Sequence, residues 1–321
     1  MLDAMESATA GIIQRCEDLF GDLRFEAARA WKAAQPGRKV IGYMPYYVPR
    51  ELIHAAGALP LGIMGGGDQL EVIHGDAYYQ SYICRIPRST IELGVSGRLD
   101  FVDGMLFPSI CDVIRNLSGM WQLMFPNVGV RYVDLPQNFE DDVGEFYRSE
   151  MNEIRHWLAG ITGRPVTGEA IRASIAVFNE NRRLVREVYA LRADEPWNVP
   201  SSEVYLLMRA GLVLPVEEHS QLVRDYIDSA RQRQRPIKDN SRVVVSGAFC
   251  EQPPLTLVKS IELSGCYIVD DDFMLVNRWE KSDVAIDGDP VANLTHAFLH
   301  DSNSTPPKYE PDQAKKLGRQ S

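Results

Sequence analysis

The chain contains only five cysteines in 321 residues, and no two of them form a CxxC pair. An odd number of scattered cysteines does not form the disulfide framework that is typical of small secreted proteins. No apolar run approaches the roughly 20 residues that cross a bilayer, and no basic segment followed by an apolar core opens the chain. We therefore expect a cytoplasmic protein that does not enter a membrane.

The sequence also lacks an excess of positive charge. Acidic residues outnumber basic ones by 44 to 34, which gives a net charge of −10. A nucleic-acid-binding surface requires clustered Lys and Arg, so we expect no nucleic-acid partner. The content of 45% hydrophobic and 24% charged residues is ordinary for a globular protein, and the length allows two hydrophobic cores.

Periodic apolar residues indicate an α/β fold in the first part of the chain. Apolar residues recur at three- and four-residue steps over residues 3–34, which predicts one helix, and Cys16 belongs to this apolar stripe as a packing residue. Short apolar segments then alternate with helical ones, which indicates a mostly parallel sheet with helices on both faces. Strands are expected at residues 40–44, 58–64, 100–107 and 128–133, and helices at 50–56 and 113–124.

The second part begins with helices and ends with another strand-helix-strand unit. Helices are expected at residues 146–161, 171–191, 204–214 and 216–231, and strands at 241–247 and 266–269. The predicted fold class is α/β with two doubly wound (Rossmann/flavodoxin-like) parallel-sheet domains, residues 1–138 and 239–321, joined by a helical segment at 139–238. Because two parallel strands are not expected to stand alone, the second domain is expected to be truncated at its C-terminus.

Two cysteines are placed where a ligand would bind. Cys111 lies where a predicted strand is followed by a helix, and ligands of open α/β sheets bind beyond the carboxyl ends of the strands. The amides and the dipole of a helix N-terminus favour the thiolate form that binds metals. Cys84 lies upstream, in a tyrosine-rich loop followed by Arg85 and Arg88. Both cysteines also suit a buried packing role, and their spacing matches no zinc pattern.

Three other features have competing interpretations. The glycines at 65–67 lack the GxGxxG and P-loop patterns, so a flexible turn is favoured over a phosphate site. The aspartates at 270–272 suit either a Mg²⁺ site or a structural salt bridge. Cys250 follows a strand and precedes a helix, as Cys111 does, and is therefore a further candidate ligand, whereas Cys266 opens a strand and is expected to be buried.

Four segments together carry a resemblance to a known family. They are GRKVIGYMPYYVPRELIHAAGALPLGIMGGG at 37–67, SYICRIPRS around Cys84, DGMLFPSICDVIRNL around Cys111, and SGCYIVDDDFMLVNRW at 264–279. With these segments the chain resembles the 2-hydroxyacyl-CoA dehydratase and benzoyl-CoA reductase family over residues 37–279. Within the family it is most similar to the smaller cluster-bearing (gamma-type) subunit of ATP-dependent benzoyl-CoA reductases.

The resemblance implies low-potential electron transfer to an aromatic acyl-CoA thioester. It implies a 4Fe-4S cluster held by Cys84, Cys111 and a third thiolate. The third cysteine of the relatives has no counterpart here. The resemblance therefore implies either that the chain is a fragment or that the third ligand comes from elsewhere, with Cys250 as the candidate substitute. The implied partners are a second cluster-bearing subunit, an ATP-hydrolysing iron-sulfur activator and ferredoxin as the upstream donor. ATP would be used only by the activator, which is a separate component.

The resemblance also suggests which residues line the substrate pocket. Tyr78, Tyr79, Ser109 and Asp112 are near enough to the two cysteines in the sequence to do so, and none is assigned a catalytic role. Two alternative functions stay open. One is a 2-hydroxyacyl-CoA dehydratase subunit, which shows no net electron consumption. The other is a metal-free scaffold subunit that completes the active site of its partner and contains no iron.

Overall fold

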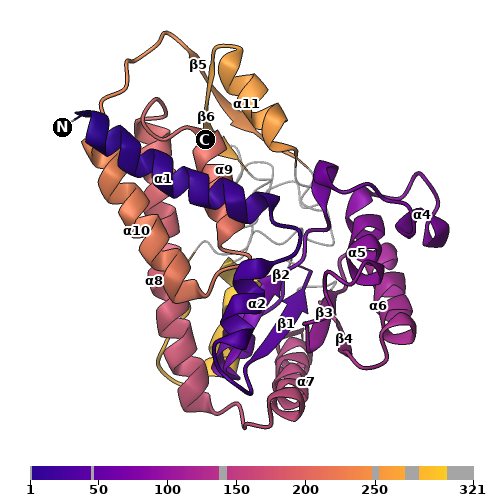
Figure 1. Ribbon diagram of the computed structural model, residues 1–321. Helices are drawn as coiled ribbons and strands as arrows, with labels where there is room; N and C mark the ends of the chain where they lie inside the picture. The colour runs from indigo at the N-terminus through magenta and orange to yellow at the C-terminus, as the bar shows by residue number, and fades with distance from the viewer. Residues whose placement is uncertain (1, 45–46, 137–142, 248–252, 272–281, 302–321) are drawn as a thin grey trace.

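The computed structural model has an α/β architecture with parallel strands and many helices (Figure 1). Within the part of the chain that it describes, no helix is both long and apolar enough to cross a membrane. The described residues are 2–44, 47–136, 143–247, 253–271 and 282–301.

The first sheet contains four parallel strands in the order β2-β1-β3-β4. Nearly every residue of the three strands β1, β2 and β3 is buried, because helices cover both faces of a doubly wound sheet. The order reverses between β1 and β3, which makes the carboxyl ends of these two strands the topological switch point. The strands are β1 (Lys39–Tyr43), β2 (Ala58–Gly62), β3 (Gly104–Pro108) and β4 (Gly129–Val133).

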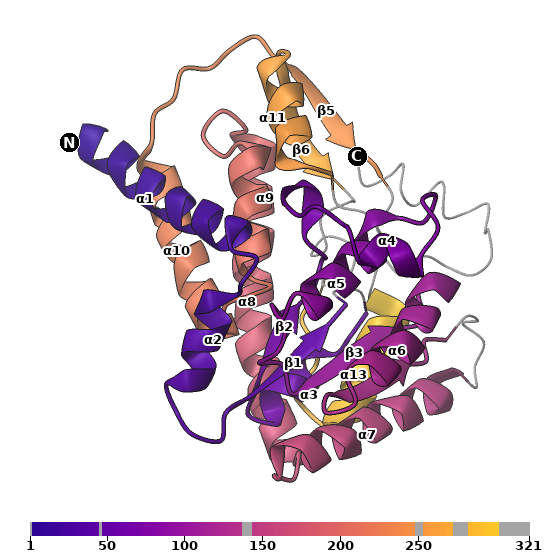
Figure 2. The ribbon, with the colours of Figure 1, turned by 45° about the vertical axis from the view of Figure 1, so that its right-hand side comes forward.

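Helices that pack in pairs cover this sheet (Figure 2). Helix α5 packs against α6, and α3 packs against α7. The close approach of α5 to α6 depends on Gly94, since a Cβ there would lie 2.8 Å from the Trp121 ring. The elements are α3 (Arg50–Ala55), η1 (Gly67–Gln69), α4 (Gly75–Tyr78), α5 (Arg85–Val95), α6 (Asp112–Met124) and α7 (Val143–Thr162).

The prediction of a single N-terminal helix is wrong. The chain forms α1 (Leu2–Gly21) and α2 (Glu26–Ala33), separated by a turn in which Phe25 adopts a left-handed conformation with φ 55°. The Asp22 carboxylate accepts hydrogen bonds from the backbone N–H of Arg24, at 2.9 Å, and of Glu26, at 2.6 Å. These bonds compete with continuation of the helix.

Cys16 on α1 is fully buried, as a packing residue should be. Burial raises the pKa of its thiol to about 12, so the thiol stays protonated.

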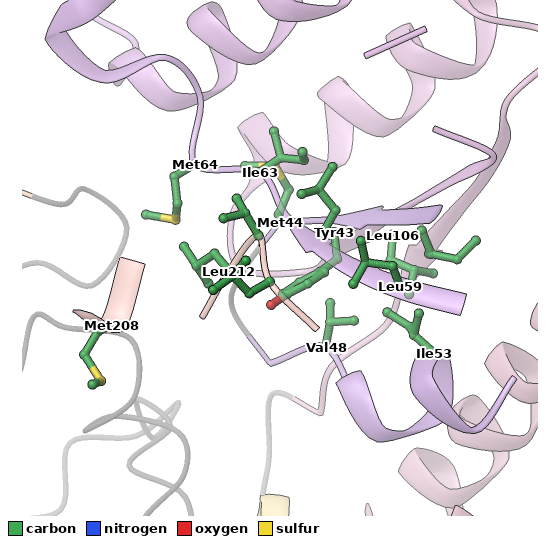
Figure 3. Packing of buried hydrophobic residues seen from close by; sticks show 14 of the residues in the cluster. Tyr43, Met44, Val48, Ile53, Leu59, Ile63, Met64, Leu106, Met208 and Leu212 are labelled. Atoms are coloured by element: carbon green, nitrogen blue, oxygen red, sulfur yellow. The ribbon is translucent and has the colours of Figure 1, made fainter. Parts of the chain in front are cut away.

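The four helices predicted between residues 146 and 231 are present, with somewhat different ends. Helix α1 packs against α9 and α10, and α10 packs against α8. The loop after α9 reaches the first sheet, where Gly62 donates a hydrogen bond to the Leu212 carbonyl at 2.8 Å. Figure 3 shows Leu212 beside Tyr43 and Met44 in one apolar cluster. The helices are α8 (Gly168–Asp194), α9 (Ser201–Ala210) and α10 (Val216–Gln232).

The second sheet pairs β5 with β6 in parallel, with a register shift between Val243 and Val244. Helices α8, α9 and α11 pack against β6, while much of β5 is exposed. Helix α13 packs against α7. The division into three regions stays a prediction. The elements are β5 (Ser241–Val245), α11 (Leu255–Leu263), β6 (Cys266–Asp271), α13 (Pro290–His296) and η2 (Ala297–Asp301).

Candidate functional site

Cys84 and Cys111 occupy equivalent positions at the start of two neighbouring helices. Cys84 is the N-cap residue of α5 and Cys111 is the N-cap residue of α6. Cys111 is exposed and Cys84 is half-buried, and neither forms a disulfide bond. The partial positive charge of a helix N-terminus stabilises a thiolate at each position. Cys111 thus lies where the sequence places it, between the end of β3 and the start of α6.

Tyr79 connects the two cysteines. Its hydroxyl donates a hydrogen bond to the Val113 carbonyl in the first turn of α6, at 3.2 Å. Burial raises the pKa of Tyr79 above its ordinary value, and the negative charges of Cys111 and Cys84 raise it further. One phenol therefore lies within electrostatic reach of both sulfur atoms, and the structure brings these three residues together.

A buried carboxylate holds the loop that leads to Tyr79. Glu92 on α5 accepts hydrogen bonds from the three backbone N–H groups of residues 73–75, at 2.6 to 3.0 Å, and lies 2.9 Å from Nδ1 of His74. Burial alone would raise the pKa of this carboxyl, but the hydrogen bonds from the His74 ring and the amides lower it below its ordinary value. The charged form of Glu92 therefore stabilises the loop.

Helix α4 is fixed to α5 directly after the residues that Glu92 holds. A Cβ at Gly75 would lie 2.1 Å from the Arg88 carbonyl, so only glycine allows this approach. Arg88 also forms an ion pair with Asp76 at 2.7 Å. The hydrogen bonds from residues 73–75 to Glu92 form the Glu92 clamp. The sequence does not predict this clamp, because no pattern shows that a carboxylate in one helix binds amides about 18 residues earlier.

The other predicted pocket residues lie along the same edge of the sheet. Tyr78 ends α4 with 49% of its surface exposed, and Asp112 is exposed in the first turn of α6. The Ser109 hydroxyl accepts a hydrogen bond from the Leu135 N–H at 2.7 Å, which joins the loops after β3 and β4. Ser109 thus has a structural role, and a substrate role for any of these residues stays a prediction.

A metal site would need more ligands than these two thiols. Across the described residues, no group of three or more His, Cys, Asp or Glu side chains is arranged to hold a metal ion. Cys250 lies outside the described residues, and Cys266 is half-buried at the start of β6 rather than fully buried. The two neighbouring thiols at helix N-termini suit part of the ligand set of an iron-sulfur cluster, which is held by cysteine thiolates.

The aspartates that end β6 form a structural ion pair. Arg192 on α8 is fully buried and lies 2.6 Å from Asp271 and 3.6 Å from Asp270. This guanidinium neutralises the carboxylates that a Mg²⁺ site would need, so the salt-bridge interpretation is confirmed for these two residues. Asp272 lies outside the described residues.

The glycine turn after β2 is required for packing against α5. A Cβ at Gly65, which has φ +67°, would lie 2.1 Å from the Ser89 hydroxyl. A Cβ at Gly66 would lie 2.4 Å from Leu70. The Gly66 N–H donates a hydrogen bond to the Ser89 hydroxyl at 3.1 Å. The structure therefore supports the turn interpretation of these glycines.

One cluster away from the cysteines has the connectivity of a catalytic triad. His54 Nδ1 lies 2.9 Å from the Ser174 hydroxyl, and Nε2 lies 3.0 Å from the Glu217 carboxylate. However, Ser174 is only 1% exposed and donates a hydrogen bond to the Glu51 carbonyl at 2.9 Å. Because Ser174 is buried, no substrate reaches its hydroxyl, and the cluster has no nucleophilic role. The cluster instead joins α3, α8 and α10.

Comparison with known proteins identifies similar chains along most of the sequence. A family model described as 2-hydroxyglutaryl-CoA dehydratase, D-component, matches residues 45–320. The chain is 67% identical over 304 residues to one of the subunits of the benzoyl-CoA reductase of Thauera aromatica, and the match covers 94% of this chain and 79% of the relative.

Two dehydratase subunits are more distant relatives. The identity is 26% over 280 residues to the beta subunit of the (R)-phenyllactyl-CoA dehydratase of Clostridium sporogenes, covering 87% of this chain and 73% of the relative. It is 30% over 244 residues to the beta subunit of the (R)-2-hydroxyglutaryl-CoA dehydratase of Acidaminococcus fermentans, covering 75% of this chain and 64% of the relative.

Proposed function

Because this chain belongs to the 2-hydroxyacyl-CoA dehydratase and benzoyl-CoA reductase family, we propose that it is an oxidoreductase subunit in the reduction of benzoyl-CoA. The observation that carries the proposal is the 67% identity to a benzoyl-CoA reductase subunit over 94% of the chain. The identities to dehydratase subunits are only 26% and 30%.

In this proposal, Cys84 and Cys111 hold a 4Fe-4S cluster together with a third thiolate from Cys250. When bound, such a cluster supplies one-electron chemistry. The neighbouring N-termini of α5 and α6 support the proposal, because they stabilise the negative charge of two thiolates at one edge of the sheet. The hydrogen bond from Tyr79 to the Val113 carbonyl fixes its phenol within electrostatic reach of both cysteines.

The acyl-CoA thioester is proposed to bind on the same edge, beside Tyr78, Tyr79, Ser109 and Asp112. The exposed ring of Tyr78 offers an aromatic surface for the acyl group. Ser109 acts indirectly, because its hydroxyl binds the Leu135 N–H and thereby orients the loop that carries Cys111. Asp112 is solvent-exposed and stabilises the N-terminus of α6 by its charge.

The proposed assembly contains a second cluster-bearing subunit, and electrons reach it from ferredoxin through an ATP-hydrolysing iron-sulfur activator. Exposure of Cys111 supports an arrangement in which this edge is covered by another subunit. We propose that the assembly acts in the cytoplasm.

Two other functions are favoured by specific observations. Similarity to dehydratase beta subunits favours a 2-hydroxyacyl-CoA dehydratase subunit. A metal-free scaffold subunit is favoured by the described residues, which supply two thiols but no three-ligand group. Net electron consumption that depends on benzoyl-CoA separates the reductase from the dehydratase, and iron content separates both from the scaffold.

The decisive experiment is anaerobic iron and sulfide analysis, with EPR after reduction, on the chain co-expressed with its partner subunit. We expect Cys84→Ala and Cys111→Ala each to lower the iron content and to remove one cluster signal. Cys266→Ala is the matched control, because this half-buried thiol opens β6 and should leave the iron content unchanged. Unchanged iron and EPR spectra in both of the first two variants would show that the chain is a scaffold.

A further inference from the structure

Helix α13 and the π-helical turn η2 that follows it carry two exposed histidines. His296 ends α13 and His300 lies in η2, so the sequence HAFLH spaces them four residues apart. Side chains at this spacing lie on the same face of a helix. The same spacing supplies the two zinc-binding histidines of the motif H-E-x-x-H. None of the other four histidines of the chain lies four residues from another histidine.

The two imidazole rings are close enough to share one metal ion. Their centroids are 4.5 Å apart, and their planes are inclined at 45°. An imidazole nitrogen binds a zinc-like metal at about 2.1 Å, so two rings at adjacent coordination positions of one ion have centres about 4.5 to 5 Å apart. The observed separation fits this range, and chelation of an ion therefore requires little movement of either ring.

The backbone between the two histidines is fixed by aromatic packing. Phe298 lies midway between them and is buried, with its ring centroid 4.4 Å from that of Tyr147 and 5.7 Å from that of Tyr47. Figure 2 shows α13 beside α7, against which it packs. The buried Phe298 thus holds η2 on the core while His296 and His300 stay exposed. A preorganised pair of ligands loses little entropy when an ion binds.

The donor set determines which class of ion fits. Imidazole nitrogens suit Zn²⁺, Ni²⁺ and Cu²⁺, whereas Mg²⁺ and Ca²⁺ prefer oxygen ligands. The net charge of −10 favours cations over anions near the surface. Across the described residues, no third His, Cys, Asp or Glu side chain joins the pair to form a larger group of ligands. Water therefore fills the other coordination positions of a bound ion.

We propose that His296 and His300 form a chelating site for one divalent late first-row metal ion, which ties the end of α13 to η2. Such π-helical turns occur frequently at functional sites. The site is independent of the proposed function, because it uses neither Cys84 nor Cys111. An experiment on this histidine pair can therefore fail while the iron-sulfur proposal stands, and the reverse is also true.

The test is calorimetric titration of Ni²⁺ into the full chain, produced without a histidine tag. We expect His296→Ala and His300→Ala each to weaken one saturable Ni²⁺ site by about 100-fold, because loss of even an outer partner of a metal ligand costs about 10–100-fold. Both side chains are exposed, so neither substitution threatens folding. His156→Ala is the matched control and should leave Ni²⁺ binding unchanged. His156 is exposed on α7, with Asn152 and Gly160 at the positions four residues away.

A second variant separates this site from the two thiols, because cysteine also binds such metals. The double variant Cys84→Ala/Cys111→Ala should retain the Ni²⁺ site that depends on His296 and His300. Hydrogen exchange followed by mass spectrometry should show that Ni²⁺ slows exchange in residues 290–301 and leaves residues 73–79 unchanged. Absence of saturable Ni²⁺ binding, or Ni²⁺ binding that is the same in the wild type and in both histidine variants, overturns the proposal.

Discussion

Two regions of the molecule each contain a buried carboxylate, but the two carboxylates have different partners. One region is the cysteine edge, where Cys84 and Cys111 cap α5 and α6, and the other is the junction between α8 and β6. Glu92 at the cysteine edge accepts hydrogen bonds from backbone amides of one nearby loop. Asp271 at the junction faces the fully buried guanidinium of Arg192. The amide clamp fixes the local conformation of one loop, whereas the ion pair joins two elements that are 79 residues apart. A mutation at the junction should therefore affect the whole fold, and one at the clamp only the functional loop.

The largest expected effect follows removal of the junction arginine. Arg192→Met should lower the free energy of unfolding by about 3–5 kcal/mol, because the Asp271 carboxylate stays buried without its arginine. Urea unfolding monitored by circular dichroism measures this change. The double variant Arg192→Met/Asp271→Leu should recover most of the lost stability, because it removes both charges. If Arg192→Met were as stable as the wild type, the ion pair with Asp271 would not stabilise the whole fold.

Removal of the clamp should have a smaller and more local effect. Glu92→Gln keeps the shape of the side chain but loses its charge, which should cost about 1–3 kcal/mol. Hydrogen exchange followed by mass spectrometry should show faster exchange in residues 73–79 and unchanged exchange in β6. Equal acceleration in both regions would show that the clamp also stabilises the global fold.

The clamp also predicts how stability depends on pH. Its hydrogen bonds hold the pKa of Glu92 in the folded chain below the ordinary value of 4.5. The unfolded chain therefore binds this proton more readily, and the stabilisation present above pH 4.5 is lost as the pH falls through the lowered pKa. The stability difference between wild type and Glu92→Gln should shrink over that acidic range. A difference that stays constant there would contradict an ionised Glu92.

Sequence periodicity predicted the elements better than it predicted their ends. The third strand was expected at 100–107 but begins at Gly104, because Leu99 and Val102 are buried in a turn and imitate the apolar pattern of a strand. The break between α1 and α2 depends on a left-handed Phe25, which no propensity indicates.

The candidate site was predicted only where it depends on local order. A strand followed by a helix placed Cys111 correctly at the N-terminus of α6. The contact between Tyr79 and Val113, the Glu92 clamp and the Arg192 ion pair join residues far apart in the chain. Such contacts are set by tertiary packing, and hydrophobic periodicity carries no information about them.

The smallest effects should come from two serines that each fix a strand end. Ser201 donates a hydrogen bond to the Ile268 carbonyl of β6 at 2.9 Å, and Ser109 accepts one from the Leu135 N–H at 2.7 Å. Ser201→Ala and Ser109→Ala should each lower the free energy of unfolding by about 1 kcal/mol, as measured by urea unfolding. Ser201→Ala should have the larger effect, because its hydroxyl is buried and also accepts a hydrogen bond from Arg192.

The serine pair also separates structural from substrate roles at the cysteine edge. If Ser109 only orients the loop before Cys111, then Ser109→Ala lowers stability and leaves the KM for benzoyl-CoA close to that of Ser201→Ala in the assembled enzyme. A KM that rises severalfold in Ser109→Ala, with unfolding unchanged, would instead place the hydroxyl against the substrate. In that case the hydrogen bond to Leu135 is replaced when substrate binds, and the edge differs from the junction in being remodelled by its ligand.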